Sequence, residues 1–351
     1  SESEKAFRFA AARYPENSRA HYNVGLVVQQ TSQLEALQHF RRSRKINPNN
    51  SFAWFGCGSA LAGLGKVKRA IKSYKAAIEI RPVFFQAYNN LALLLSANEA
   101  DQAAEYFRTA VQINPGFAEA LNNLGTTLHH AGRLPQSLEA FQSCVRIRPW
   151  GVAYNNMGLV LKDMEREKDA LAAFSKSAEL QPSSSDAYFH LANMQFRLLE
   201  VDYASRSYHK AWQLSPNEVH LLGKLAHTQQ FSCDWQGFEQ SMPTVHEALA
   251  NGNTNVMNPF EALAISLPPN AFLQVARAYA GQAPSLFTHA RKQNGRDAPL
   301  KLGYVSSDFK KHPVMSVAGG IFQSHDRSDF EVSFNLFQSF QSDRIYLFRS
   351  S

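Results

Sequence analysis

Asparagines recur at regular spacing in this 351-residue sequence, and their carboxamides are of a type that can bind a ligand. A carboxamide both donates and accepts hydrogen bonds, so a row of them can hold a polypeptide backbone without reading its side chains. The alternative is that these positions are solvated and bind nothing, because an exposed asparagine needs no partner in the protein. The recurring residues are Asn23, Asn90, Asn123 and Asn156.

A second group of chemically capable residues lies in a segment over residues 306–313, which reads as a loop. A neutral imidazole has one donor and one acceptor nitrogen, so His312 can accept a proton or can position a substrate, and both roles stay open. Lys310 and Lys311 can attract a phosphate, although a solvated lysine pair is the alternative. The carboxylate of Asp308 can organise the loop.

The asparagines lie within a repeat of 33 or 34 residues that is marked by prolines, each preceded by an aromatic residue eight positions earlier. Proline cannot continue a helix and disfavours helical geometry in the residue before it, so it forces a turn at a fixed position. Small residues at helical spacing from the aromatic residues predict two closely packed helices in each repeat. The prolines are Pro15, Pro48, Pro82, Pro115, Pro149, Pro182 and Pro216; the aromatics are Phe7, Phe40, Tyr74, Phe107, Phe141, Phe174 and Tyr208.

This pattern is similar to the tetratricopeptide repeat in its length and in its small, aromatic and proline positions. We expect the second helix of a truncated repeat in residues 1–17, six repeats in 18–218, and a partial seventh repeat with a helical linker in 219–298. Such a superhelix presents a groove for extended peptides, and copies of the chain can also associate through the repeats. A clamp for acidic C-terminal peptides ranks lower, because it would need Lys and Arg where the asparagines stand.

The pattern changes after the linker, where an incomplete second domain is expected over residues 299–351. Residues 300–305 alternate and are rich in β-formers, residues 314–322 carry one helical apolar stripe, and residues 330–337 form a second apolar run. This order predicts a β-α-β unit, which opens a parallel sheet. Ligands of open α/β sheets bind beyond the carboxyl ends of the strands, so His312, which follows the first strand, is expected near a ligand site.

The order of segments resembles the protein O-linked N-acetylglucosamine transferases and their plant and bacterial relatives. The resemblance rests on the repeats, on Cys233-Asp234-Trp235, on residues 302–309, on His312-Pro313 and on residues 325–332. It implies an all-α tetratricopeptide superhelix followed by the first β-α-β unit of an α/β glycosyltransferase B-type lobe. In that family, UDP-N-acetylglucosamine donates the sugar to Ser or Thr of intracellular proteins, with no metal and no cofactor.

The resemblance also implies roles for individual residues. The four recurring asparagines would line the groove and hold the backbone of the protein substrate. His312 would lie at the active-site cleft as the catalytic residue. The rest of the active-site loop would be Ser307, Asp308, Lys311 and Pro313.

The sequence after residue 337 shows no further elements of a donor-binding lobe, so we expect the 351-residue chain alone to be inactive. Sugar transfer by the purified chain would contradict that expectation. Two other functions stay open: a non-catalytic tetratricopeptide adaptor, and a relative that transfers fucose from GDP-fucose.

The charge, the hydropathy and the cysteine content of the sequence exclude several other classes of protein. There are 36 Lys and Arg against 29 Asp and Glu, and no run of like charge demands a nucleic acid. No apolar stretch approaches the roughly 18 residues that a membrane helix needs. Cys57, Cys144 and Cys233 are too widely spaced for a disulfide framework or a zinc site. We therefore expect a soluble protein of a reducing compartment, the cytoplasm and in eukaryotes also the nucleus, with no metal and no membrane partner.

Overall fold

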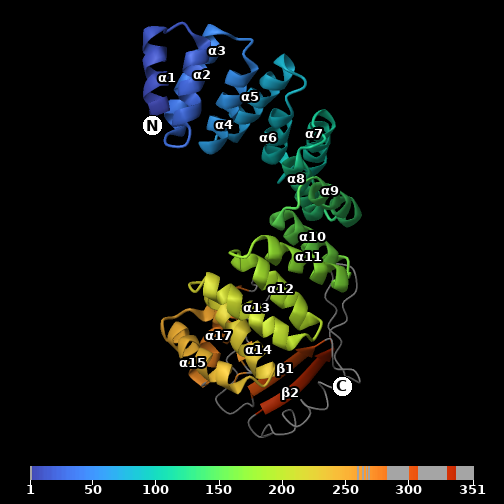
Figure 1. The fold of residues 1–351 in the computed structure, drawn as a ribbon. Helices are drawn as coiled ribbons and strands as arrows, with labels where there is room; N and C mark the ends of the chain where they lie inside the picture. The colour runs from blue at the N-terminus through green and yellow to red at the C-terminus, as the bar shows by residue number, and fades with distance from the viewer. Residues whose placement is uncertain are drawn as a thin grey trace. The chain divides into compact units, whose positions relative to one another are not determined.

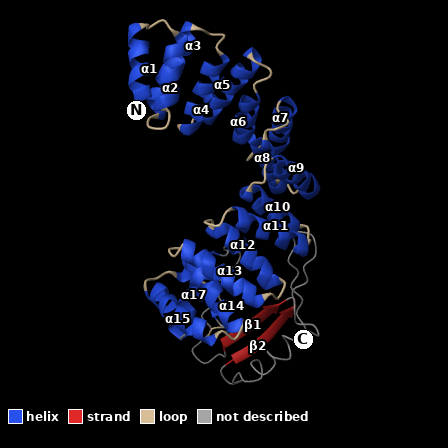
Figure 2. Cartoon of the chain, viewed as in Figure 1, coloured by secondary structure: helices blue, strands red, loops and turns tan. Residues whose placement is uncertain are grey.

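The computed structural model describes residues 2–258, 261–262, 265, 267, 269–282, 300–306 and 330–336. The chain divides into two units, Ser1–Gln282 and Ala283–Ser351. Helices form the described part of the first unit, and a pair of strands forms the described part of the second (Figures 1 and 2). Each unit is treated by itself below.

The first unit is a succession of antiparallel helical hairpins, in which each helix packs against the one before it and the one after it (Figure 1). A single helix, α1 (Glu2–Arg13), comes before them. The hairpins are α2 (Ser18–Val28) with α3 (Gln33–Ile46), α4 (Ser51–Gly63) with α5 (Val67–Ile80), α6 (Phe85–Leu95) with α7 (Ala100–Ile113), α8 (Ala118–His130) with α9 (Leu134–Ile147), α10 (Gly151–Asp163) with α11 (Glu167–Leu180), α12 (Ser185–Arg197) with α13 (Val201–Leu214), and α14 (Val219–Phe231) with α15 (Trp235–Ala250). A short 3-10 helix, η1 (Thr254–Val256), and α17 (Pro269–Gln282) follow.

The hairpins are held closed by an aromatic ring from the second helix that lies against a small residue of the first helix. Phe141 of α9 is fully buried, and a Cβ built on Gly125 of α8 would lie only 2.8 Å from its ring. Phe174 and Gly158 repeat this arrangement at 2.6 Å. In these two hairpins a residue larger than glycine would meet the ring, so the predicted close approach of the two helices is confirmed there.

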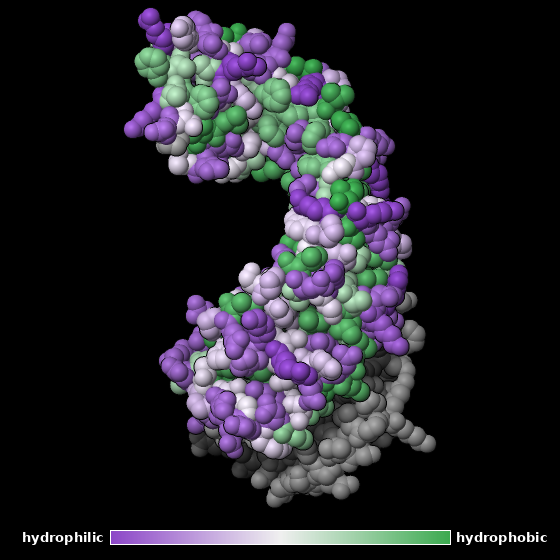
Figure 3. All heavy atoms as spheres, in the orientation of Figure 1, coloured by the Kyte–Doolittle hydropathy of each residue, from purple (hydrophilic) through white to green (hydrophobic). Residues whose placement is uncertain are grey.

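The buried core continues from hairpin to hairpin. One cluster of buried side chains runs from Ala11 to Ala140, and further clusters continue it toward Val275. Figure 3 shows hydrophilic residues over much of the drawn face of this unit, with hydrophobic residues exposed between them. Since each hairpin buries its apolar face only against its neighbours, the stability of the unit depends on stacking.

The last hairpin departs from the proline and aromatic pattern but keeps the geometry. The side chain of Asp234 accepts a hydrogen bond from the backbone N–H of Gly237 at 3.0 Å, which caps α15 at its N-terminus. Aspartate is a favoured N-cap residue, so Asp234 fixes where this helix begins. Pro243 lies inside α15, where no turn forms, and α15 packs against α14 as the second helix of a seventh pair.

The second unit contains two parallel strands, β1 (Leu300–Ser306) and β2 (Phe330–Leu336). They pair in register from Leu300 opposite Phe330 to Ser306 opposite Leu336. The two strands lie in the segments that the sequence predicts to be β-rich, and the predicted helix over residues 314–322 lies outside the described residues.

No helix among the described residues is both long enough and apolar enough to cross a membrane.

Candidate functional site

Asparagines on consecutive first helices are hydrogen-bonded to one another across the repeats. Nδ2 of Asn123 on α8 donates to Oδ1 of Asn89 on α6 at 3.1 Å. One repeat later, Nδ2 of Asn156 on α10 donates to Oδ1 of Asn122 on α8, also at 3.1 Å. Each bond joins residues 34 positions apart, so the same contact recurs with the period of the hairpins.

The bonded asparagines form two layers. The inner asparagines, Asn89 and Asn122, are each 7% exposed, whereas Asn123 and Asn156 are half-buried. We call Asn90, Asn123 and Asn156 the outer asparagines. Among the described residues nothing donates to Oδ1 of Asn123 or Asn156, so this oxygen and the second amide N–H keep unused hydrogen-bonding capacity.

The outer position also borders the aromatic core of the preceding hairpin. Nδ2 of Asn90 lies 3.5 Å from the hydroxyl oxygen of Tyr74, and its Oδ1 accepts from Nδ2 of Asn89 at 3.1 Å. In α4 the equivalent residue is Gly56, where a Cβ would lie 2.6 Å from the ring of Phe40. The row of carboxamides is therefore interrupted at α4, because the ring of Phe40 fills the space that a side chain would need.

The structure thus divides the four asparagines that the sequence singles out. Asn90, Asn123 and Asn156 lie on α6, α8 and α10 as one continuous row. Asn23 lies on α2, separated from them by α4. At the other end, Oδ1 of Asn155 is buried and has no hydrogen-bond partner among the residues that the structure describes, and the next first helix carries His190 at the outer position.

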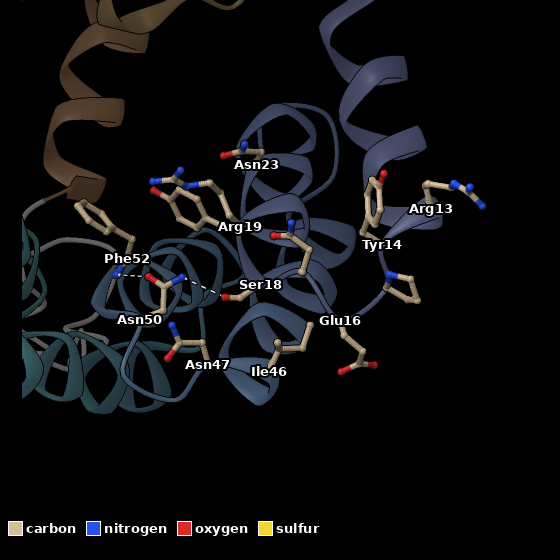
Figure 4. Close-up of a pocket in the computed structure, with 13 residues that line it drawn as sticks. Arg13, Tyr14, Glu16, Ser18, Arg19, Asn23, Ile46, Asn47, Asn50 and Phe52 are labelled. Carbon is tan, nitrogen blue, oxygen red and sulfur yellow. Dashed lines mark hydrogen bonds between the residues drawn. The ribbon is translucent and has the colours of Figure 1, made fainter.

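Asn23 lies instead in the wall of a cavity of about 980 Å³, between the end of α1 and the starts of α2 and α4 (Figure 4). Arg19, Tyr22, Asn50 and Phe52 line the same cavity. Asn50 joins the two hairpins there, since its Nδ2 donates to the Ser18 hydroxyl at 3.3 Å.

The loop that the sequence proposes for chemistry cannot be placed. Its residues, which all lie outside the described residues, are Ser307, Asp308, Lys311, His312 and Pro313. Within the described part of the chain, no three His, Cys, Asp or Glu side chains come together in a way that could hold a metal ion.

A stack of antiparallel helical hairpins that shows a polar row on its first helices defines a helical-repeat binding scaffold. Family models of the tetratricopeptide repeat match residues 1–51, 58–98, 93–149 and 152–184. The chain is a tetratricopeptide repeat protein, and its first unit is an all-α superhelix of a kind that mediates protein–protein interactions.

The similar curated proteins include two glycosyltransferases. One is the "Probable UDP-N-acetylglucosamine--peptide N-acetylglucosaminyltransferase SEC" of Arabidopsis thaliana, 32% identical over 124 residues, which are 31% of this chain and 13% of that protein. The other is the "Protein O-mannosyl-transferase TMTC3" of Homo sapiens, 25% identical over 233 residues, 62% of this chain and 22% of that protein. The chain therefore spans less than a quarter of either relative, and the similarity lies in their repeat regions.

Solved structures agree with the fold. The "APC/C hetero-tetramer Cut9-Hcn1" superimposes with a TM-score of 0.54 at 19% identity, over 65% of this chain and 45% of that one. The Pseudomonas aeruginosa pilF structure gives 0.50 at 18% identity, over 66% of this chain and 97% of that one. At these identities the likeness concerns the fold alone.

Sequence reasoning alone missed two features of this surface. The first is the set of hydrogen bonds between inner and outer asparagines. Its signal in the sequence is the 34-residue spacing of Asn89 from Asn123, which equals one repeat. The cavity beside Asn23 has a weaker signal: Arg19 precedes Asn23 by four residues, which places both on one face of α2.

Proposed function

We propose that the repeats bind an extended polypeptide through its backbone, with the outer asparagines as the main contacts and Asn23 as a further one. The observation that carries this proposal is the hydrogen bond of each outer carboxamide to an inner carboxamide. That bond fixes the orientation of the outer amide and directs its remaining acceptor and donor toward a ligand. A preorganised donor–acceptor pair loses little side-chain entropy on binding, so modest bonds add up to useful affinity.

Backbone recognition makes a specific prediction about the ligand. Uncharged peptides of unrelated sequence should bind with similar affinity, because a carboxamide reads C=O and N–H groups that every residue shares. The test is a fluorescence-polarisation titration of the full chain with several unrelated peptides and with a copy of the best binder carrying N-methylated backbone amides. Loss of binding on N-methylation supports the proposal, and unchanged binding contradicts it.

The protein side of the test is the double variant Asn123→Ala/Asn156→Ala. Two lost contacts of about 1 kcal/mol each should weaken peptide binding by more than tenfold. Asn98→Ala, an exposed asparagine in the turn after α6, is the matched control and should bind normally. Circular dichroism must show that the double variant is folded, because it also leaves the inner asparagines without their partners.

A second candidate function is recruitment of protein substrates for O-linked glycosylation. It is favoured by the similarity to the Arabidopsis thaliana protein and by the parallel strands β1 and β2 that follow the repeats, as the first strands of a transferase lobe would. In this reading His312 acts in that lobe, with Ser307, Asp308, Lys311 and Pro313 around it, and UDP-N-acetylglucosamine is the donor. GDP-fucose remains an alternative donor.

Recruitment can be tested by cross-linking the full chain to proteins of a cell extract and identifying them by mass spectrometry. Enrichment of peptides that carry N-acetylhexosamine on Ser or Thr, lost in the double variant, supports substrate recruitment. Capture of unmodified proteins in the same proportion as in the extract favours a binding scaffold without a role in glycosylation.

A further inference from the structure

The cavity beside Asn23 carries positive charge that no acidic side chain neutralises. Arg13 and Arg19 line it and are exposed, and neither forms an ion pair within the described part of the chain. The acidic residue of the lining, Glu16, is already bound by Nη2 of Arg42 at 2.5 Å. The cavity therefore has two guanidinium groups available for an external anion.

The neutral polar groups of the lining are also biased toward donation. Oδ1 of Asn17 caps α2 by accepting from the backbone N–H of Ala20 at 3.1 Å. Oδ1 of Asn50 accepts from the backbone N–H groups of Phe52 and Ala53 at 3.2 and 3.3 Å. Since Oδ1 of Asn17 is occupied by the helix cap, its amide N–H groups are what remains for a ligand. Nδ2 of Asn50 already donates to the hydroxyls of Ser18 and Ser43, at 3.3 and 3.5 Å, so Asn50 shapes the cavity wall rather than binding the ligand.

An aromatic wall lies beside these donors. The rings of Tyr22 and Phe52 have centroids 6.1 Å apart, and Phe52 is 43% exposed. Burial raises the pKa of Tyr22, so its hydroxyl stays protonated and can donate. Figure 4 shows Arg19 on the same side of the cavity as Asn23 and Phe52, with Arg13 on the other side.

The geometry points to a subsite for an acidic segment within a bound polypeptide. We infer that Arg19 pairs with an Asp or Glu side chain of that segment, that Arg13 receives a second carboxylate, and that an adjacent apolar side chain packs on Phe52. Guanidinium–carboxylate pairs are among the stronger polar contacts, and planar arginine can bind both carboxylate oxygens. This inference rests on the proposed function, because Arg19 lies one helical turn from Asn23 on the same face of α2.

The probes are short fluorescent peptides with amidated C-termini that carry two acidic residues beside a Phe or a Leu. Matched peptides replace Asp and Glu by Asn and Gln. The full chain should bind the acidic peptides about tenfold more tightly at low salt, and the difference should shrink as salt screens the charges.

Arg19→Gln should remove most of this preference for acidic peptides, and Arg13→Gln should remove part of it. Arg69→Gln, an exposed arginine on α5 outside the cavity, is the control and should keep the preference. Equal binding of acidic and amide peptides, or an unaffected preference in Arg19→Gln, would overturn the subsite. A preference that appears only with a free C-terminal carboxylate would also overturn it, because the segment proposed is internal.

Failure of this inference is distinguishable from failure of the proposed function. If only the subsite is wrong, neutral peptides still bind and still lose affinity in Asn123→Ala/Asn156→Ala. If the carboxamide row does not bind the backbone, that double variant leaves neutral peptides unaffected, while the effect of Arg19→Gln on acidic peptides can still be measured.

Discussion

The ring of His190 is stacked on the ring of Phe174, with centroids 5.5 Å apart and ring planes 19° apart. His190 stands on α12 at the position that asparagine occupies on α6, α8 and α10. A histidine stacked in this way makes no hydrogen bond to Asn155, whose buried Oδ1 has no partner within the described part of the chain. The carboxamide row therefore ends at this ring pair.

His190→Asn should extend the row by one repeat. The new amide can donate to Oδ1 of Asn155, and satisfying a buried acceptor is worth about 1–3 kcal/mol, against about 0.5–1.5 kcal/mol for the lost ring contact. We expect the free energy of unfolding in urea to rise by about 1 kcal/mol. His130→Asn, at an exposed histidine, should leave it unchanged. A clear fall in His190→Asn would mean that this site requires the imidazole.

Stability should decrease as the pH falls from 7.5 toward 5.5. Burial lowers the pKa of His39, His190 and His227, and the neighbouring His21 lowers that of His39 further. The unfolded chain then takes up protons at a higher pH than the folded chain, so stability is fully present above the ordinary histidine pKa of about 6.5 and is lost below it. Urea unfolding at several pH values measures this slope, and His190→Asn should make it shallower. An unchanged slope in that variant would exclude His190 as a contributor.

Gly125→Ala should destabilise the α8–α9 hairpin. Alanine in a helix is normally favoured over glycine by about 1 kcal/mol, but here its Cβ would lie 2.8 Å from the ring of Phe141. Overpacking typically costs about 1–3 kcal/mol, so we expect a net loss of about 1 kcal/mol in thermal or urea unfolding. Gly116→Ala meets only Asn114 Oδ1 at 3.5 Å and should be neutral. If the ring is the cause, Gly125→Ala should cost less in a Phe141→Leu background than in the unchanged chain.

The helical part of the fold could be predicted from sequence because its signals are local and repeated. Pro115 and Phe107 fix a turn and a core position that the hairpins before the last one share. The end of the row was harder to predict, since it depends on which residue borders a ring of the preceding hairpin. The spacing of Asn89 and Asn123 shows their period, but only coordinates show that one donates to the other. The cavity beside Asn23 combines residues from four helices, which no single-helix periodicity reveals.

Alkylation of the folded chain should modify one of its three cysteines. Burial raises the pKa of Cys57 and of Cys144 to about 11, and both side chains are almost fully buried. Such thiols are almost entirely protonated near neutral pH. They react slowly, because the thiolate is the nucleophile. Cys233 is exposed, so iodoacetamide should add one group to the folded chain and three to the urea-unfolded chain. Intact-mass spectrometry counts the additions, and peptide mapping should place the native one at Cys233.

Glu261→Gln should weaken the packing around α14. The Glu261 side chain is 5% exposed, and its carboxylate accepts from Lys224 Nζ at 2.5 Å and from the backbone N–H of Asn258 at 3.0 Å. Losing the charge while keeping the shape should cost about 1–3 kcal/mol of unfolding free energy. Glu247→Gln, at an exposed position of α15, serves as the control and should cost less than about 0.5 kcal/mol. Equal effects of the two substitutions would show that the buried pair contributes nothing specific.

The bond from Asn156 to Asn122 has a consequence for how such a surface can evolve. Donor and acceptor belong to successive copies of the same unit, so duplication of one complete unit reproduces both halves of the contact and lengthens the row. An insertion of any other length inside a hairpin would displace a donor from its acceptor on each side. The row of outer asparagines can therefore lengthen or shorten only by whole repeats. Among homologous chains, the length of the row should vary in steps of one hairpin.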